Sequence, residues 1–265
     1  MNNGKQVKVV AAIIFNDKKQ VLISTRPKGK SYAGYWEFAG GKQEIYETSF
    51  QTLQRELNEE LGLKIDYATP WLKKNVVYDR VYLSLFFWRV YPKNWSGAVT
   101  PRENQEWKWV DIPSLAQKKL LPANHSVVNA LQIPEVLFLS NSILLANNKE
   151  FQILPYKEAT HKRQSIYISH KDVENLGCLP NFEWVAVVVE NKEEMRVSLE
   201  AHAVIWNISS EHSFQELTEV LSEGQFIPIL AINFSNQEAS KLRELGLHGF
   251  IYTAINNDLS ITHNH

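Results

Sequence analysis

The order of apolar and polar positions divides the chain into strand-like and helix-like segments. Short apolar runs rich in β-branched and aromatic residues, bounded by turn residues, are typical of strands. In the first half such runs occupy residues 7–15, 20–26, 71–78, 81–91 and 106–110. The polar residues at 16–19 and 79–80 predict hairpins between neighbouring runs. Two later helices are expected, one beginning at 112–113 and one spanning 124–131.

One segment of the first half has helical periodicity. Four apolar residues recur every three or four positions and therefore share one helix face, namely Phe50, Leu53, Leu57 and Leu61. Thr48 suits the N-cap, with Gln51 as its capping-box partner. Gly62 suits the left-handed position that ends a helix. The sequence therefore predicts a helix between Thr48 and Gly62.

The opposite face of this helix is acidic. Glu56, Glu59 and Glu60 stand at intervals of three and four residues, so their carboxylates lie together. Three like charges would destabilise an isolated helix, and a bound divalent cation would remove that conflict. The alternative interpretation is a solvated acidic face with an ordinary salt bridge from Arg55.

A longer motif surrounds these residues. From Gly41 to Leu63 the chain has Gly, five residues, Glu, seven residues, and then Arg-Glu-Leu-Asn-Glu-Glu-Leu-Gly-Leu. This resembles the Nudix box at all nine of its specified positions. The resemblance implies a Nudix α/β/α sandwich with a mixed sheet, and a hydrolase that directs water at a nucleoside diphosphate linkage. It also implies Mg²⁺, or Mn²⁺, as cofactor, because such hard cations take oxygen ligands.

The Nudix resemblance assigns roles to individual residues. The catalytic set comprises Arg55, Glu56, Glu59 and Glu60. The metal ligands comprise Glu56, Glu59, Glu60 and the backbone carbonyl of Gly40. Arg55 would orient Glu56, and Glu47 would brace Arg55. Spacing leaves open which glutamate, if any, acts as a base.

Features outside the box resemble the MutT branch of the family, which hydrolyses 8-oxo-dGTP. They are Trp36-Glu37-Phe38-Ala39-Gly40-Gly41-Lys42, Arg26 twelve residues before Phe38, Asp79-Arg80, Glu103 in a loop, and Leu121-Pro122-Ala123-Asn124. Ala39 departs from the proline usual in that branch. The resemblance implies substrate binding by Arg26, Phe38, Arg80 and Asn124. It adds Glu103 as a further metal ligand.

Each of these residues also has a purely structural interpretation. Phe38 can stack on a purine or pack in the core. Asn124 can hydrogen-bond a purine edge in a bidentate way or cap the helix that follows. Arg26 and Arg80 can pair with phosphate or the base edge, or remain solvated. Loop carboxylates such as Glu103 usually face solvent.

The second half, residues 133–265, has a different pattern. Its short and often continuous apolar runs occupy 136–139, 165–169, 184–189, 203–207, 227–232 and 249–252. Continuous runs suit strands that are buried on both faces, as in parallel sheets. Helical segments at 213–223 and 236–245 lie between the last of them, which predicts β/α units.

This half resembles the later β/α units of thiamine monophosphate synthase, most visibly over residues 201–252. Such a barrel usually takes about 250 residues, but only residues 133–265 remain after the Nudix domain, which we expect to span residues 1–132. The Gly-Gly pair that binds phosphate in the synthase is replaced by Ala231-Ile232-Asn233. For both reasons we expect residues 133–265 to form a smaller, degenerate and partial TIM-barrel-like domain without catalysis.

The charge balance and the cysteine content of the chain indicate where the protein is located and which partners it binds. The net charge of −1 and pI of about 6.7 provide no global field for a nucleic acid polymer or an anionic membrane. No apolar stretch approaches membrane-spanning length, and no signal pattern is present. Cys178 is the single cysteine, which fits a reducing cytoplasm, and we expect it to be a small core residue.

The sequence therefore predicts a cytoplasmic hydrolase acting on a small-molecule nucleotide. The main hypothesis is conversion of 8-oxo-dGTP, or a related oxidised purine nucleotide, to the monophosphate and pyrophosphate, which protects DNA replication from oxidised precursors. One alternative is a Nudix hydrolase acting on another nucleoside diphosphate linked to a group X. Another is a module that senses a nucleotide or a thiamine-related phosphate.

Overall fold

The computed structural model describes residues 6–78, 81–103, 105–146 and 150–253. The chain divides into two compact units, Met1–Gln132 and Ile133–His265. Each unit has hydrophobic cores of its own.

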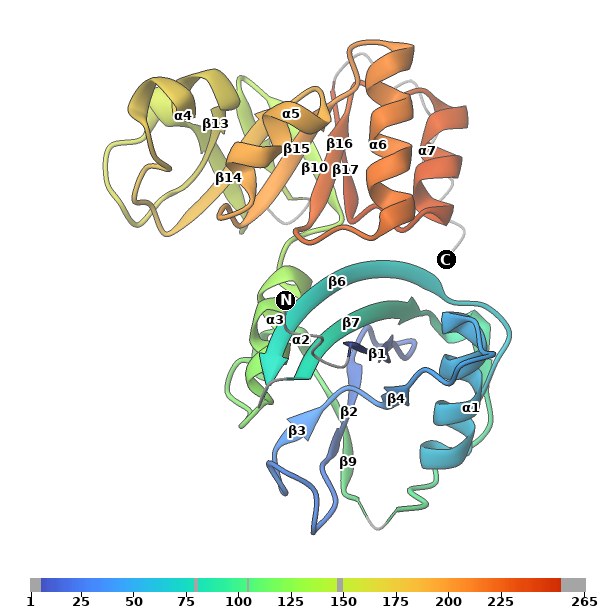
Figure 1. The fold of residues 1–265 in the computed structure, drawn as a ribbon. Helices are drawn as coiled ribbons and strands as arrows, with labels where there is room; N and C mark the ends of the chain where they lie inside the picture. The colour runs from blue at the N-terminus through green and yellow to red at the C-terminus, as the bar shows by residue number, and fades with distance from the viewer. Residues whose placement is uncertain (1–5, 79–80, 104, 147–149, 254–265) are drawn as a thin grey trace. The chain divides into compact units, whose positions relative to one another are not determined.

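The first unit is built on a mixed four-stranded sheet in the order β4-β1-β7-β6 (Figure 1). Its strands are β1 (Gln6–Ile14), β4 (Gly40–Lys42), β6 (Thr69–Tyr78) and β7 (Val81–Val90). β1 runs parallel to β7, while β4 and β6 are antiparallel to their neighbours. A second sheet, β3-β2-β9, joins β3 (Trp36–Glu37), β2 (Val21–Thr25) and β9 (Trp107–Val110). The short strands β5 (Lys64–Ile65) and β8 (Trp95–Ser96) form a separate pair.

Helices cover both faces of the mixed sheet. Helix α1 (Ser49–Leu61) buries its predicted apolar face against alternate residues of β1 and against Val90. Helices α2 (Ile112–Leu115) and α3 (His125–Leu131) belong to the core on the other face, and the 3₁₀ turn at Pro122–Asn124 leads into α3. This layering is the expected α/β/α sandwich.

The turn at 16–19 forms, but the strands beside it separate. Phe15 and Val21 make one antiparallel bridge across the turn. Beyond that bridge, β1 pairs with β4 and β7, whereas β2 pairs with β3 and β9. The predicted hairpin is therefore a link between two sheets. The expected turn residues Asp79 and Arg80 lie outside the described residues.

The second unit is a closed barrel in which strands β10 to β17 follow in chain order. They are β10 (Val136–Ser140), β11 (Ile143–Leu145), β12 (Gln152–Pro155), β13 (Ser165–Ser169), β14 (Trp184–Val189), β15 (Ala203–Asn207), β16 (Ile229–Ile232) and β17 (Gly249–Tyr252). Parallel pairing of β17 with β10 closes the ring. Helices α4 (His170–Leu176), α5 (Lys192–Met195), α6 (Glu211–Glu223) and α7 (Asn236–Glu244) lie between the later strands.

The barrel is shortened in its connections rather than in its strands. β11 is antiparallel to both β10 and β12, so short connections without a helical crossover join these three strands. Asn141 and Ser142 have φ values of 47° and 66°. Positive φ at both central residues is the pattern of a two-residue type I′ hairpin turn. The apolar runs of β11 and β12 are very short, so the hydrophobic pattern does not predict these two strands.

Both faces of the barrel strands are apolar, which explains their continuous hydrophobic runs. Ala186, Ile205 and Leu230 lie in the interior cluster, whereas Val187 and Trp206 belong to the cluster shared with the helices. No helix in the described part of the chain is long and apolar enough to cross a membrane.

The expected role of Cys178 is wrong. The side chain is exposed, directly after the C-terminal glycine of α4, and it is not a core residue. The apolar character of a cysteine cannot bury it where the helix has already ended at the surface.

Candidate active site

The acidic helix α1 begins and ends where the sequence predicted. The Thr48 hydroxyl accepts the Gln51 N–H at 3.2 Å, and the Gln51 side-chain oxygen accepts the Thr48 N–H at 2.8 Å. Gly62 ends the helix in the left-handed region, with φ of 69°. The capping box and the C-terminal glycine are therefore confirmed.

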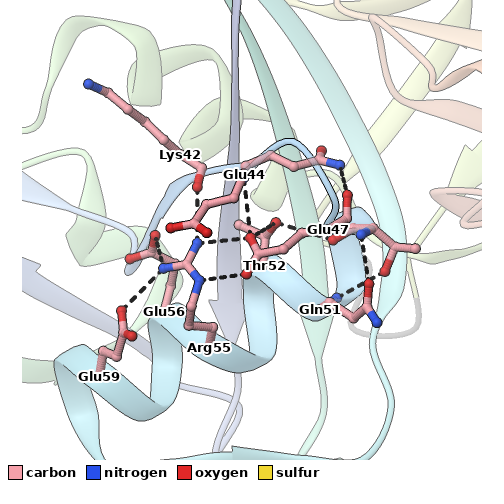
Figure 2. A network of polar contacts seen from close by, with 10 residues as sticks. Lys42, Glu44, Glu47, Gln51, Thr52, Arg55, Glu56 and Glu59 are labelled. Carbon is pink, nitrogen blue, oxygen red and sulfur yellow. Dashed lines mark hydrogen bonds and ion pairs between the residues drawn. The ribbon is translucent and has the colours of Figure 1, made fainter.

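Arg55 is the centre of the polar network beside this helix (Figure 2). Its Nε and Nη2 atoms donate to the two carboxylate oxygens of Glu47 at 2.7 and 3.0 Å. Its Nη1 donates to Glu56 at 2.8 Å and to Glu59 at 3.1 Å. Nη2 also reaches the Lys42 carbonyl at 3.1 Å. The structure thus places Arg55 between Glu47 and Glu56, in the contacts that the resemblance implied, and adds Glu59 and Lys42.

The electrostatics of this network keep it charged. Hydrogen bonding from Arg55 lowers the pKa of Glu47 to about 2, and the Thr52 hydroxyl adds a bond at 2.9 Å. The same pairing with Glu47 raises the pKa of Arg55 above its usual range. A bidentate guanidinium–carboxylate pair has a defined geometry as well as a strong attraction. Glu47 therefore holds Arg55 in one orientation over the acidic face.

Two glycines bring strand β4 against β1 and α1. Gly40 has φ of 149°, and a Cβ there would lie 2.1 Å from the Val10 carbonyl oxygen. Its N–H donates to Glu60 Oε2 at 3.2 Å. A Cβ on Gly41 would lie 2.2 Å from the Glu56 carboxyl carbon. Only glycine at both positions allows this close packing.

Glu60 is the most perturbed carboxylate of the site. Burial raises its pKa to about 8, with further contributions from the charges of Glu56, Glu103 and Glu37, while the Gly40 N–H acts in the opposite direction. Within the described residues no Lys or Arg side chain pairs with it. The ionised form of Glu60 therefore lacks a compensating positive charge.

This donor set fits a hard divalent cation. Carboxylate oxygens and a backbone carbonyl are the ligands that Mg²⁺ and Mn²⁺ take, and a cation would compensate the charge on Glu60. As they stand, no three acidic, histidine or cysteine side chains of the described residues converge on one metal position. The reason is visible in the contacts: Glu56 and Glu59 both turn to Arg55, and Glu60 turns to Gly40.

The guanidinium of Arg26 already makes two hydrogen bonds within the protein. Its Nη1 donates to Glu37 at 2.6 Å, and its Nε donates to the Ser31 carbonyl at 2.8 Å. Burial raises the pKa of Glu37, and Arg26 opposes that effect. Arg26 is thus neither a freely solvated arginine nor one whose guanidinium is wholly available to a ligand.

The segments that precede Phe38 and Asn124 are joined, because the Leu121 N–H donates to the Trp36 carbonyl at 3.0 Å. Phe38 is 4% exposed and packs edge-on against Phe87, with ring centroids 6.2 Å apart. The structure therefore places Phe38 in the core, and its contact with a base stays a prediction.

Asn124 is 5% exposed and makes no N-cap hydrogen bond to α3. The capping hydrogen bond considered for Asn124 is therefore absent, and its amide atoms are not among the fully buried polar atoms that lack a partner in the described part of the chain.

The loop residue Glu103 lies near the acidic helix. Its charge acts on Glu60, and its carboxylate accepts a bond from Lys30 at 3.0 Å. The predicted substrate residue Arg80 lies outside the described residues.

Three residues near this site were not singled out from the sequence, namely Lys30, Glu37 and Gln105. Glu37 lies in the same short segment as Phe38 and Gly40, which was a usable signal. Lys30 and Gln105 carried no such signal, because a lysine or glutamine in a polar loop is usually solvated.

A mixed sheet carrying an acidic helix, with a guanidinium fixed over its glutamates, is the arrangement of a Nudix domain. The family model described as NUDIX domain matches residues 5–131. The chain belongs to the Nudix family of hydrolases.

Curated relatives match the same half of the chain. The 8-oxo-dGTP diphosphatase of Haemophilus influenzae is 35% identical over 127 residues, which is 48% of this chain and 92% of that protein. The 8-oxo-dGTP diphosphatase of Escherichia coli is 30% identical, over 48% of this chain and 98% of its own. The CTP pyrophosphohydrolase of Escherichia coli is 36% identical, over 48% and 91%. A solved structure from a study of MutT of Aliivibrio salmonicida and Vibrio cholerae is 36% identical over 47% of this chain and 94% of that chain, with a TM-score of 0.41.

Proposed function

We propose that this protein hydrolyses 8-oxo-dGTP, or a related oxidised purine nucleoside triphosphate, to the monophosphate and pyrophosphate in the cytoplasm. Such a reaction removes oxidised precursors before they enter DNA. Family membership supports the hydrolysis, and two relatives named as 8-oxo-dGTP diphosphatases support the substrate class.

Within the proposal, Glu56, Glu59, Glu60, Glu103 and the carbonyl of Gly40 hold Mg²⁺ or Mn²⁺. When bound, the cation would offset phosphate charge and activate water for attack. The chain supplies the positions of these oxygens.

Arg55 fixes the orientation of Glu56 and Glu59 while it is itself fixed by Glu47. Arg26, held by Glu37, presents its remaining N–H groups to the nucleotide.

The observation that carries the substrate assignment is the buried side chain of Asn124. An amide offers one donor and one acceptor, which can bind a purine edge in a bidentate way. Its side chain makes no capping hydrogen bond, so the amide is available to a ligand although the residue is only 5% exposed. A base that bonds this amide would gain two directional hydrogen bonds.

A second candidate keeps the chemistry and changes the base. The CTP pyrophosphohydrolase of Escherichia coli is as similar to this chain as the 8-oxo-dGTP diphosphatases are. An amide can also bond the donor and acceptor of a cytosine edge. CTP is therefore the competing substrate to measure.

The test is a comparison of kcat/KM for 8-oxo-dGTP, dGTP and CTP at fixed Mg²⁺, with identification of the products. Preference for 8-oxo-dGTP over dGTP, with release of pyrophosphate, is the expected result. Preference for CTP would replace the substrate and keep the reaction. Equal kcat/KM for all three nucleotides would contradict the proposal that Asn124 selects the base.

The second unit resembles thiamine monophosphate synthase in its pattern of strands and helices. We propose that it is not catalytic and does not carry out the chemistry of that enzyme. Barrel enzymes place their sites at the carboxyl ends of the strands. There, Asn233 with φ of 62° donates to Asn207 at 2.8 Å, and Asn207 donates to Glu190 at 2.7 Å. These side chains bond one another at the place where a phosphate would need bare backbone, which supports the proposal.

A further inference from the structure

The carboxyl end of α1 is capped by the loop that carries Glu103. The last carbonyls of a helix have no partner within it. Here the Thr100 N–H donates to the Leu61 carbonyl at 2.8 Å, and the Arg102 N–H donates to the Glu60 carbonyl at 3.0 Å. The loop is therefore attached to the end of the acidic helix by its backbone.

Gln105 adds a side-chain bridge to this attachment. It is 7% exposed. Its Nε2 donates to the Glu60 carbonyl at 3.2 Å, and its Oε1 accepts the Glu103 N–H at 2.8 Å. One buried amide thus joins the backbones of Glu60 and Glu103, although they are far apart in sequence. From the other side, Lys30 holds the Glu103 carboxylate at 3.0 Å.

We propose that Gln105 is a positioning residue that sets the distance between the Glu103 and Glu60 carboxylates. The inference rests on the proposed metal-dependent hydrolysis, for which these two carboxylates are ligands. Without the Gln105 amide, the Glu103 N–H loses its acceptor and the Glu60 carbonyl loses one of two donors. The loop is then free to move Glu103 away from Glu60. Displacement of a catalytic group by about 1 Å can reduce the rate by about 100-fold.

The test compares Gln105→Met with a matched control in the barrel. Gln225 is 1% exposed and has the same pattern, because its Nε2 donates to the Gly246 carbonyl at 2.6 Å and its Oε1 accepts the Ile229 N–H at 3.1 Å. Gln225→Met therefore removes two equivalent bonds in the other unit. It should lower Tm and leave kcat and the Mg²⁺ requirement unchanged.

For Gln105→Met we expect kcat to fall by about 10-fold to 100-fold. The Mg²⁺ concentration for half-maximal rate should rise, and the nucleotide KM at saturating Mg²⁺ should change little. A second readout needs no metal: amide exchange at Glu103 in the metal-free full-length protein should accelerate in Gln105→Met and not in Gln225→Met. If Gln105→Met does not fold, Gln105→Asn retains an amide that is one methylene too short to reach both partners, and it should give the same effects.

A double-mutant cycle separates positioning from general destabilisation. In a Glu103→Gln background, Gln105→Met should cause little further loss of kcat, because the residue through which it acts is already altered. The inference is overturned if Gln105→Met retains wild-type kcat and Glu103 exchange, or if its loss is undiminished in the Glu103→Gln background. Absence of hydrolysis by the wild type would instead reject the proposed function, while the metal-free exchange at Glu103 would still decide the bridge.

Discussion

The carboxylate of Glu56 lies directly against the bare Cα of Gly41, so that a Cβ at Gly41 would fall 2.2 Å from the Glu56 carboxyl carbon. The contact joins the first glycine of the motif to a glutamate of α1. It explains in steric terms why the motif has a glycine there.

Gly41→Ala should therefore displace the Glu56 carboxylate from Arg55. The added methyl meets the far end of a flexible side chain, so the chain should still fold. We expect kcat to fall by about 100-fold, as for other small displacements of a catalytic group. Steady-state kinetics and thermal unfolding measure the two effects. Gly177→Ala, where a Cβ meets nothing within 4 Å but φ is +72°, is the control and should lower stability without lowering kcat.

The free energy of unfolding should depend on pH through the ionisation of Glu60. Its pKa is raised to about 8 in the metal-free folded protein, against 4.5 for an ordinary glutamate. Between these values the folded state binds more protons than the unfolded state, so the free energy of unfolding falls as pH rises. Mg²⁺ should reverse this loss, and the increase in Tm that it causes should be larger at pH 8 than at pH 5.5.

Glu60→Gln is the control for that measurement, because it keeps the shape and removes the titration. The variant should show a shallower fall in Tm with pH and no metal-dependent turnover. Glu37, whose pKa is also raised by burial, contributes a slope of the same sign to both proteins. An unchanged slope in Glu60→Gln would contradict the assignment.

Arg55→Lys should show that geometry matters more than charge. A lysine retains one positive charge, but it cannot bond both oxygens of Glu47 while reaching Glu56 and Glu59. We expect kcat to fall by about 10-fold to 100-fold with little change in the nucleotide KM. Arg102→Lys, at an exposed arginine whose guanidinium donates to the Asn58 carbonyl at 2.9 Å, is a matched comparison and should lose far less. Equal losses would mean that Arg55 contributes only charge.

Asn124→Ala should change base selection more than hydrolysis. A bidentate amide–base contact discriminates by about 1–3 kcal/mol, so the ratio of kcat/KM for 8-oxo-dGTP over dGTP should fall by about 5-fold to 150-fold. Turnover of dGTP should change little. Losses of equal size on both substrates would count against base recognition by Asn124.

Local spacing was enough to predict the acidic helix. Thr48, Gln51 and Gly62 act within one turn of the helix ends, so their roles follow from neighbours in the chain. The contacts of Arg55 with Glu56 and Glu59 are equally local. Residues whose environment depends on distant segments were harder to interpret. Phe38 lies in the core beside Phe87, and this burial depends on how the segment between β3 and β4 packs against β7.

The barrel shows the same limit on a larger scale. Six apolar runs predicted six of its strands, because strands buried on both faces are continuous in sequence. β11 and β12 were missed, since a three- or four-residue strand is recognisable only through its partners. The turn at Asn141 and Ser142, whose positive φ values join β10 to β11, was likewise not visible in the hydrophobic pattern.

By itself, the sequence determined the Nudix motif, the limits of α1 and the grouping of its glutamates, because helical periodicity and capping act over a few residues. Only the tertiary structure decided that Glu37 pairs with Arg26, that Gln105 joins Glu60 to Glu103, and that Asn124 is buried without capping its helix. These relationships depend on which distant segments share a desolvated space. Burial of that kind, rather than residue type, raises the pKa of Glu60.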